Sequence, residues 1–522
     1  MKRISIILFS LALLTAPSCS RLDLAPEDYY GSGNFWNKTA QVEAFMLGLH
    51  TDLRATYRSM FVLGEARGGT SKHGTSSLNT SLDWSSPVKD NDFTKDKTQL
   101  TNWDGYYGRI LRVNLFILNV ENGCQFLTDK ERNYLLGQAY GLRAYYYFRL
   151  YRAWGGVPLI KEVEVFEGQT DAKDLYRPRA TPKQIMDFIK EDINTSDSYF
   201  GDDFSFKGTR ALWSKAATLM LKTEINLWSA KVTTGDQAPA ATDLQTAKDA
   251  LTPLMGRFSL LQNFSSIFSY TDKENDEIIF AKRFLDNEAT NFGGEFLTQN
   301  AVFLGQVYAL NGSLISVDPL DMRGVGGPLR NEYKFGLFES YDDADSRKKA
   351  TFFDFYQTSN QLNGGTLMIK GIGFINANNV RVFASDIPVY RYADALLLMA
   401  EIENKLGNDP SAYINQIRRR AYGSLYNETL HRYTDAGFAA NELAILRERD
   451  KEFVWEGKRW YDVVRMHDAN GRALVFSPEA NYDDVNPILN FQTEAHKLLL
   501  PVDVNTLNND PELKQTPGYD TN

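Results

Sequence analysis

The chain has 522 residues, with 57 lysines and arginines against 66 aspartates and glutamates, and a formal net charge of −9 at pH 7. This acidic balance argues against a general nucleic-acid-binding protein, which carries a basic footprint, and against a surface held by anionic lipid alone. The length is ample for a large hydrophobic core. We therefore expect no nucleic-acid partner and a large folded domain.

The first residues have the pattern of an export signal. Met1-Lys2-Arg3 precedes an apolar run over residues 4–16, and small residues lead to Cys19. A basic start, a short apolar core and small residues before the cleavage point are typical of a signal peptide, and this run is too short to span a bilayer. The position of the cysteine is similar to that in a bacterial lipoprotein signal, so we predict removal of residues 1–18 and acylation of Cys19. The alternative is an ordinary signal peptide in which the cysteine stands by chance.

Besides Cys19, the chain contains one further cysteine, Cys124. We expect no intrachain disulfide, and we expect Cys124 to be a small buried hydrophobic residue. Residues 19–37 are predicted to form a lipidated tether that attaches the protein to the membrane. Residues 38–522 are predicted to form a single domain.

Helical periodicity dominates residues 38–255. Thr128 and Glu131 form a predicted capping box, and the run from Thr181 to Gln184 combines a cap, a proline at the first helical position and a glutamine that reaches back. Thr209 is predicted to open a further helix. Another predicted helix has one face formed, at steps of three and four, by Trp103, Tyr107, Ile110, Asn114 and Ile117.

Helical periodicity returns in residues 386–465. Residues 390–406 are predicted to form a helix that ends at Gly407, and Asp409-Pro410 begins another. Two helices joined by about three residues form an antiparallel hairpin. Several such hairpins side by side indicate a tetratricopeptide-like scaffold, although no clean period of about 34 residues is present. The predicted repeats are therefore degenerate.

Residues 64–97 and 255–385 lose helical periodicity and are predicted to be irregular. The longer segment is rich in Gly, Asn, Asp and aromatic residues, and residues 277–280 and 366–370 predict small strands. Long irregular segments inside a folded protein are commonly functional, and large aromatic residues argue against disorder. We therefore predict a mainly α fold, with tetratricopeptide-like helical hairpins and a large region of loops and short strands packed on one side.

Five sets of residues carry a family resemblance. The main one is the run RDKEFVWEGKRWYDVVR at residues 449–465. The others are residues 22–26, residues 142–148 with 154–159, residues 390–394 with 400–401, and residues 500–502 with 515–519. Each is a weak pattern alone, but their order and completeness, from residue 19 to about 519, resemble the SusD/RagB family of outer-membrane nutrient-binding lipoproteins.

The resemblance implies both a fold and a function. The fold is a mostly helical, tetratricopeptide-like half with an irregular half packed against it. The function is capture of glycans at the cell surface, beside a SusC-like TonB-dependent outer-membrane barrel that the protein covers as a lid and to which it passes oligosaccharide. The resemblance implies no catalysed reaction and no cofactor.

Most residues of the 449–465 run are expected to be structural. Glu456, Arg459, Asp462 and Arg465 have spacings that allow pairing along a helix, and we interpret them as a structural ion-pair network. We also expect three large aromatic residues in the core rather than in a ligand site: Trp103, Phe453 and Trp460.

The candidate ligand residues lie in the irregular segments. Sugar rings stack on aromatic planes and hydroxyl groups need directional hydrogen bonds, so a glycan site needs exposed Trp or Tyr beside polar side chains. Trp84 lies in a polar, non-periodic stretch, and the alternative is that it packs its own loop onto the scaffold. Arg67 is predicted to bind hydroxyls, and the alternative is that it ties down its loop. The full predicted set is Arg67, Asn79, Asp83, Trp84, Tyr308 and Tyr333.

Metal and enzyme chemistry have weak support in the sequence. Residues 341–347 contain several aspartates but lack the glycine and the distal glutamate of a calcium loop, and the pair Asp345 and Arg347 resembles a structural marker of the family. We predict no metal ion. The alternatives from other classes are a helical-toroid glycoside hydrolase, which needs two carboxylates about 5–9.5 Å apart, and a helical-repeat interaction scaffold. No metal-ligand spacing relates the five histidines, His50, His73, His431, His467 and His496.

Overall fold

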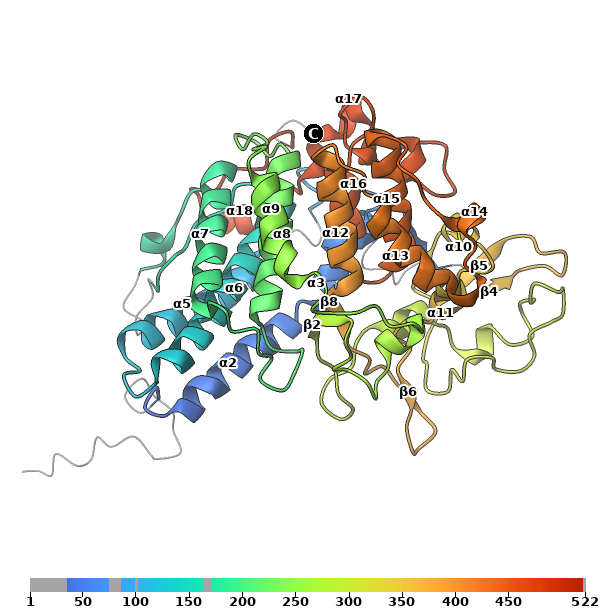
Figure 1. The fold of residues 1–522 in the computed structure, drawn as a ribbon, viewed down its shortest axis with the longest axis horizontal. Coiled ribbons are helices and arrows are strands. Elements are labelled where there is room, and N and C mark those ends of the chain that lie inside the picture. Colours follow the sequence, from blue (N-terminus) through green and yellow to red (C-terminus); the bar gives the residue numbers. More distant parts are fainter. Residues whose placement is uncertain (1–34, 75–85, 99–101, 164–170, 520–522) are drawn as a thin grey trace, which may run out of the picture.

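Helices and irregular segments occupy different sides of the molecule. The computed structural model describes residues 35–74, 86–98, 102–163 and 171–519. In Figure 1 the helices fill the left and the top, whereas the yellow-green to gold segments lie at the lower centre and right. This arrangement confirms the predicted mainly helical, tetratricopeptide-like fold with loops and short strands packed on one side.

The α-helices come in two groups along the chain. The first group is α2 (Thr39–Arg54), α3 (Tyr57–Phe61), α4 (Ser86–Lys89), α5 (Asp104–Asn122), α6 (Asp129–Trp154), α7 (Pro182–Phe200), α8 (Lys215–Lys231) and α9 (Asp243–Leu251). The second group is α10 (Phe335–Glu339), α11 (Ser346–Thr351), α12 (Tyr392–Lys405), α13 (Ser411–Tyr422), α14 (Glu428–His431), α15 (Phe438–Glu452), α16 (Arg459–Arg465), α17 (Phe491–Glu494) and α18 (Val504–Asn509). Short turns include the π-helical η2 (Val62–Ala66) and the 3-10 helices η6 (Gly293–Phe296) and η11 (Ala495–Leu498).

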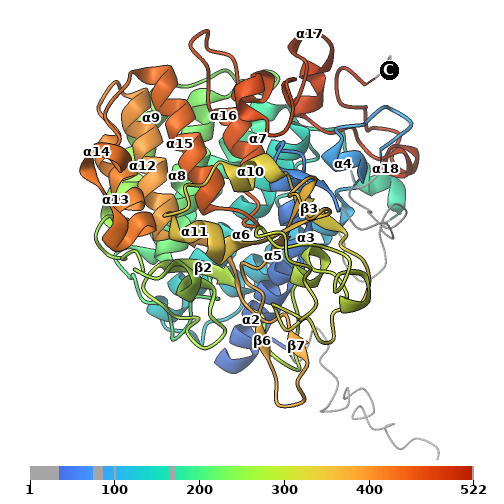
Figure 2. The same ribbon diagram turned by 90° about the vertical axis from the view of Figure 1, so that its right-hand side faces the viewer.

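Helix α6 is the centre of the first group. It packs against α5 and α7, and the pairs α7–α8 and α8–α9 continue the series of neighbouring helices. From Tyr134 to Trp154 nearly every side chain of α6 is buried, as expected for a helix that is covered on all sides. Figure 2 shows α12, α13 and α15 side by side, and α12 also contacts α8 and α9. The two groups therefore form one helical layer.

The predicted helix caps are confirmed. Thr128 and Glu131 form a reciprocal capping box at the start of α6, and Thr181 and Gln184 form another at the start of α7. Each box satisfies backbone N–H groups that the first helical turn leaves without a partner. The sequence signal is reliable here because the interaction is local.

The helix predicted to open at Thr209 begins later, as α8, with Ser214 as its cap. The reason is tertiary. The Thr209 hydroxyl and the N–H of Arg210 both donate to the Glu274 carboxylate, and the carbonyl of Arg210 accepts the N–H of a β2 residue. These contacts hold residues 209 and 210 outside the helix.

The strands are short and pair two by two. All pairs are antiparallel: β1 (Ser71–His73) with β3 (Asn331–Tyr333), β2 (Ile278–Lys282) with β8 (Ile387–Arg391), β4 (Phe352–Tyr356) with β5 (Gly364–Met368), and β6 (Phe374–Ile375) with β7 (Arg381–Val382). β2 and β5 confirm the strands predicted at residues 277–280 and 366–370. β8 corrects the helix predicted over residues 390–406, because pairing with β2 holds residues 390 and 391 extended and α12 begins at Tyr392.

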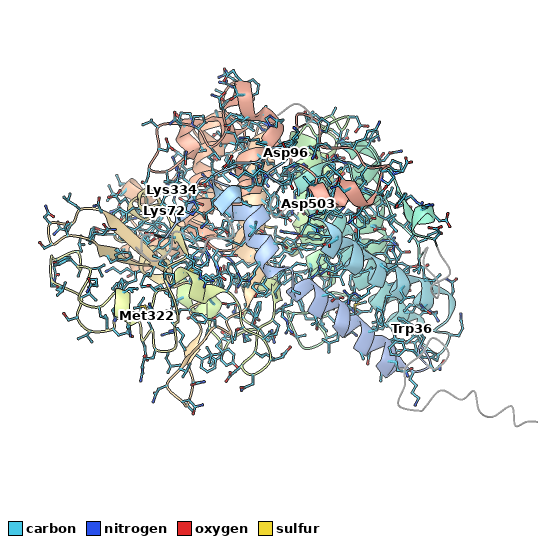
Figure 3. All side chains as sticks on the ribbon, turned by 180° about the vertical axis from the view of Figure 1, so that it is seen from behind. Trp36, Lys72, Asp96, Met322, Lys334 and Asp503 are labelled. Atoms are coloured by element: carbon cyan, nitrogen blue, oxygen red, sulfur yellow. The ribbon has the colours of Figure 1, made fainter. Side chains whose placement is uncertain are left out.

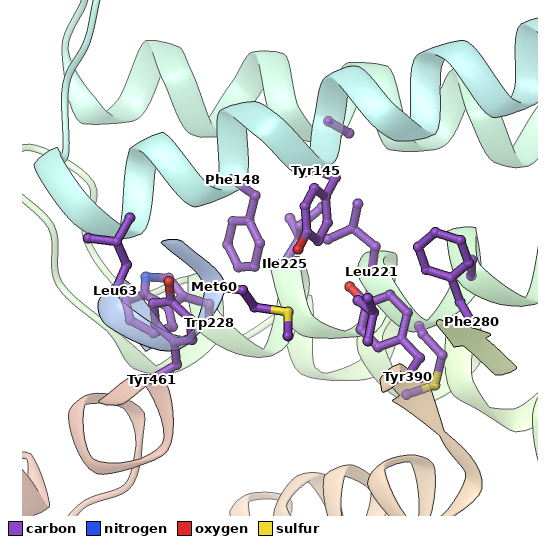
Figure 4. Close-up of a cluster of buried hydrophobic side chains, with 14 of the residues drawn as sticks. Met60, Leu63, Tyr145, Phe148, Leu221, Ile225, Trp228, Phe280, Tyr390 and Tyr461 are labelled. Carbon is purple, nitrogen blue, oxygen red and sulfur yellow. The ribbon is translucent and has the colours of Figure 1, made fainter. Parts of the chain in front are cut away.

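The hydrophobic core joins segments that are far apart in the chain. Figure 4 shows a buried cluster to which α6, α8, β2, β8 and α16 each contribute a side chain; these include Phe148, Leu221, Phe280, Tyr390 and Tyr461. Burial also confirms the core positions predicted for Trp103, Cys124, Phe453 and Trp460.

A second buried feature is a cluster of ion pairs. Arg391, at the end of β8, lies 2.8 Å from Glu277, 2.6 Å from Glu452 and 2.9 Å from Glu456. Arg420 of α13 also contacts Glu277 and Glu452. Burial by itself would raise the pKa of Glu452, but the guanidiniums of Arg420 and Arg391 outweigh it and hold this pKa well below its usual range. The cluster links the irregular region to the helices.

The structural role predicted for the 449–465 run is confirmed, but its pairs do not follow one helix. α15 ends before Glu456 and α16 begins after it. Arg465 lies 2.9 Å from Asp462 along α16 and 2.7 Å from Glu401 on α12. Apart from the pair within α16, these carboxylates and cations come together by packing between elements.

We expect Arg391→Met to destabilise the protein strongly, because it leaves Glu277, Glu452 and Glu456 buried without a central cation. The free energy of unfolding should fall by about 3–5 kcal/mol, the usual cost of removing one partner of a buried ion pair. The matched control is Arg419→Met, because Arg419 pairs with Glu428 on the surface at 3.2 Å and such a pair contributes less than about 1 kcal/mol. Urea unfolding measures the free energy of unfolding of both variants. Equal losses in the two would contradict the proposed contribution of the cluster to stability.

Candidate functional site

Three of the six predicted ligand residues lie in the chain between β1 and α4. Asn79, Asp83 and Trp84 fall outside the described residues, as does Cys19, so their roles stay predictions. The chain enters this segment through β1 and returns at α4, which packs against β1 and η2. The register that pairs β1 with β3 is Ser71 with Tyr333, Lys72 with Glu332, and His73 with Asn331.

Polar side chains around this strand pair form a connected group, here called the ribbon surface (Arg58, Lys72, Lys89, Glu295 and Asn331), in which Asn331 is buried and links its neighbours. The Lys89 ammonium donates to Asn331 Oδ1 at 2.7 Å, the Asn331 amide donates to Glu295 at 3.2 Å, and Arg58 lies 2.5 Å from Glu295. The side chains of Arg58 and Lys72 are 40% and 33% exposed, and Figure 3 shows where Lys72 lies. Cations, amide and carboxylate together are groups that bind hydroxyl-rich ligands.

Arg67 is buried inside the protein. Its Nε donates to Asn91 Oδ1 at 2.9 Å, and another N–H donates to the carbonyl of Lys497. Its guanidinium lies 3.8 Å from the ring centre of Trp460, and burial lowers its pKa to about 10. These contacts favour the alternative interpretation, in which Arg67 ties its loop to the rest of the protein, and argue against a glycan contact.

Tyr333 is also buried, which argues against the ligand role predicted for it. Its hydroxyl donates to Glu65 Oε1 at 2.6 Å, and the same carboxylate accepts the N–H groups of Trp455 and Gly457, each at 2.7 Å. Burial raises the pKa of Glu65 to about 7, although the three hydrogen bonds act in the opposite direction. Tyr333 and Glu65 thus join the ribbon surface to the segment between α15 and α16.

Among the described candidates, only Tyr308 has a half-buried side chain. Its N–H and carbonyl exchange hydrogen bonds of 2.8 Å with Tyr356, at the end of β4. β4 pairs with β5, and β5 packs against β3, so short strands connect Tyr308 to the ribbon surface. The same loop exposes Leu310 and Leu314. Tyr308 therefore lies beside β4, and the strands β4, β5 and β3, here called the strand layer, connect it to the ribbon surface.

Sequence reasoning missed most of the ribbon surface. Lys89 and Asn331 are 242 positions apart in the chain, and Arg58 and Glu295 are similarly remote. Their residue types are common and they share no motif or spacing. The pairing of β1 with β3 and the packing of α3, α4 and η6 around it bring them together, so no signal in a single sequence was available to find them.

The described residues hold no group of three or more His, Cys, Asp and Glu side chains placed to bind a metal ion. In the aspartate-rich stretch 341–347, Asp345 lies 2.7 Å from Arg347, and both side chains are buried. Arg347 also contacts Glu448 and Glu452, each at 3.0 Å. This carboxylate therefore takes part in the structural ion pairs, as the sequence predicted.

These features define a helical-repeat protein with a large insertion of loops and short strands. Two family models match the sequence: the SusD family over residues 360–519, and a family described as starch-binding and associating with the outer membrane over residues 32–222. A SusD superfamily protein of known structure from Bacteroides fragilis is 40% identical, with 93% of this chain and 100% of that chain covered and a TM-score of 0.86. The chain belongs to the SusD family.

Other relatives match over nearly their full length. NanU of B. fragilis is 32% identical, with a TM-score of 0.80 over 95% of this chain and 100% of that one. The SusD-like protein P38 of Formosa agariphila is 27% identical over 90% of this chain and 92% of its own length. Surface glycan-binding protein A from Bacteroides fluxus is 19% identical, with a TM-score of 0.68 over 92% of this chain and 100% of that one, and at this distance it shows only the same fold.

We expect Glu65→Gln to remove a pH dependence of stability. Because the pKa of Glu65 is raised in the folded protein, the folded state holds this proton more tightly than the unfolded chain. Its contribution is complete below its unfolded pKa and is lost as the pH rises through about 7. Between about pH 5 and pH 8 the wild type should therefore lose more stability than Glu65→Gln. Urea unfolding at both pH values measures this, with Glu428→Gln on the surface as control; parallel curves for wild type and Glu65→Gln would contradict the assignment.

Proposed function

We propose that this protein is a lipid-anchored, surface-exposed glycan-binding protein of the bacterial outer membrane. It captures oligosaccharide or polysaccharide and delivers it to a SusC-like TonB-dependent transporter. The observation that carries the proposal is the near full-length similarity to SusD superfamily proteins. The description of the family matched at residues 32–222, as starch-binding and associating with the outer membrane, supports the same location and ligand class.

The proposed binding site consists of the ribbon surface and the segment next to it. Trp84 supplies the aromatic plane on which a sugar ring stacks. Asp83 accepts hydrogen bonds from the sugar hydroxyls, and Asn79 both accepts and donates them. Arg58 and Lys72 of the ribbon surface add charged donors at the base of this segment. Tyr308, at the outer end of the strand layer, supplies a second aromatic ring for a longer chain.

The proposed role involves binding without a chemical step. The hydrolase alternative needs an acid and a base across a sugar cleft, and the scaffold alternative needs no sugar at all. Incubation of the purified protein with a panel of polysaccharides separates the three. Retention on a glycan gel without released sugar supports the proposal, and released oligosaccharide supports a hydrolase. The absence of both retention and release supports a scaffold.

We expect Trp84→Ala to weaken glycan retention about tenfold, which corresponds to about 1.4 kcal/mol of lost stacking, with little change in melting temperature. Affinity electrophoresis on the retained glycan measures the loss. Trp103→Ala is the contrasting variant, because Trp103 is buried against Trp154 at 5.7 Å between ring centres. It should lower stability by about 3–5 kcal/mol. A fall in melting temperature for Trp84→Ala as well would identify Trp84 as a packing residue.

We expect Cys19→Ala to release the protein from the membrane fraction. Acyl chains on Cys19 would supply the anchor, at about 0.8 kcal/mol for each buried methylene. Among the described residues, no helix has the length and hydrophobicity needed to cross a membrane. Fractionation of cells that express wild type, Cys19→Ala and the control Cys124→Ala measures the effect. A Cys19→Ala protein that still sediments with outer membranes would show that the lipid is not the sole anchor.

A further inference from the structure

A cavity of about 330 Å³ adjoins the ribbon surface, because Arg58 belongs to both. It lies between residues 55–63, which include α3, and the first turns of α5, and Figure 2 shows these two helices near each other. Trp154, at the end of α6, completes its wall. The two segments are directly linked, because the hydroxyls of Ser59 and Tyr106 lie 3.1 Å apart. A ligand at the ribbon surface can therefore extend into this cavity past Arg58.

Two cations are buried behind the cavity wall. Lys282, at the end of β2, is 2% exposed, and its ammonium donates to the Thr56 hydroxyl at 2.7 Å. Arg149 of α6 is also 2% exposed, and it donates to the Ser59 carbonyl and the Tyr106 hydroxyl, each at 3.3 Å. In the part of the chain that the structure describes, no carboxylate lies within ion-pair distance of either cation. Their three hydrogen-bonding partners all line the cavity.

This excess of positive charge favours an anion supplied from outside the chain. Buried charges in proteins are usually paired. Burial lowers the pKa of Lys282, and the guanidiniums of Arg149 and Arg109 lower it further, so both lie close enough to repel it. An anion in the cavity would offset this repulsion. It does not need to touch the buried cations, because electrostatic attraction acts across the side chains between them.

The groups that a ligand can contact belong to the cavity wall itself. Arg109 of α5 lines the cavity and is half-buried. Its Nε donates to the carbonyl of Asp52 at 2.9 Å and one amino group donates to that of Gly105, which leaves the second amino group for a ligand. Asn102 is exposed, and its amide nitrogen is available because only its oxygen is used, by the N–H of Asp104.

Charge and size together select the ligand. The exposed Asp104 is the acidic side chain among the described lining residues, whereas Arg58 and Arg109 both line the cavity and Arg149 and Lys282 lie behind it. The volume lies within the range of small-molecule sites. We infer that this cavity holds the anionic group of a sugar, a carboxylate or a sulfate, so that the glycan of the proposed function, on which this inference rests, is an acidic one. The Arg109 guanidinium donates to the oxygens of that group.

The test compares sugars that share a ring and differ in charge. Isothermal titration of the wild-type protein with D-glucose, D-glucuronate and D-glucose 6-sulfate measures three affinities. We expect at least one charged sugar to bind at least tenfold more tightly than glucose, because only a charged group offers a strong acceptor to the cations. The tighter of the two charged sugars identifies the anion as a carboxylate or a sulfate.

The inference is overturned if neither charged sugar binds more tightly than glucose, or if none of the three binds. Retention on the polysaccharide panel judges the proposed function separately. A protein that retains neutral polysaccharide and shows no preference for charged sugars keeps the proposed function and loses this inference.

Three variants locate the anion. Arg109→Gln should lower the affinity for the preferred charged sugar at least tenfold, whereas Asp104→Asn should raise it several-fold, because it removes a carboxylate that repels the ligand. Arg112→Gln is the matched control and should bind like wild type, because Arg112 lies three residues further along α5, pairs with Asp52 at 3.1 Å and does not line the cavity. Unchanged affinity in Arg109→Gln, or lower affinity in Asp104→Asn, would overturn the assignment.

Discussion

The structure depends on a set of charges that are buried together. Glu277 precedes β2, Arg391 ends β8 and Glu452 ends α15, and the Arg391 guanidinium lies 2.8 Å from the Glu277 carboxylate and 2.6 Å from that of Glu452. A charge in the protein interior is costly unless it is paired and hydrogen-bonded. These side chains therefore tolerate only an arrangement in which the three elements meet. The cluster fixes how the irregular region lies on the helical layer, and Lys370, 2.5 Å from Glu456, extends it to the residues after β5.

At the ribbon surface, the buried residues that stabilise the fold differ from the groups proposed to bind the glycan. Glu65, Arg67 and Tyr333 are buried beneath it, and they bind backbone groups or aromatic rings of the segments around Trp455 and Trp460. Their contacts hold β1 and β3 in place. In the proposed function, the groups that meet the glycan lie above this support and can differ in type without loss of the fold.

Sequence reasoning succeeded where an interaction is local or where periodicity is strong. The capping boxes at Thr128 and Thr181 and the stripe that includes Trp103 behave as predicted. The family run at residues 449–465 is structural as predicted, although its ion pairs do not all lie along one helix. It failed at Thr209 and Tyr390, where contacts with Glu274 and with β2 override the helical pattern. For the candidate site, it proposed Arg67 and Tyr333 as ligand residues, and both are buried. A polar side chain in an irregular stretch gives no sign of whether it points outward or into a buried hydrogen bond.

The amino-acid sequence by itself determined the helical class, the position of the irregular region and the family, because periodicity, caps and ordered motifs are properties of neighbouring residues. Only the tertiary structure decided which charges are buried together, which candidate residues support the ribbon surface, and that Arg58, Lys89, Glu295 and Asn331 form one surface. Those outcomes depend on pairs of residues from distant parts of the chain. Burial and pairing at that distance arise from packing, which no local pattern encodes.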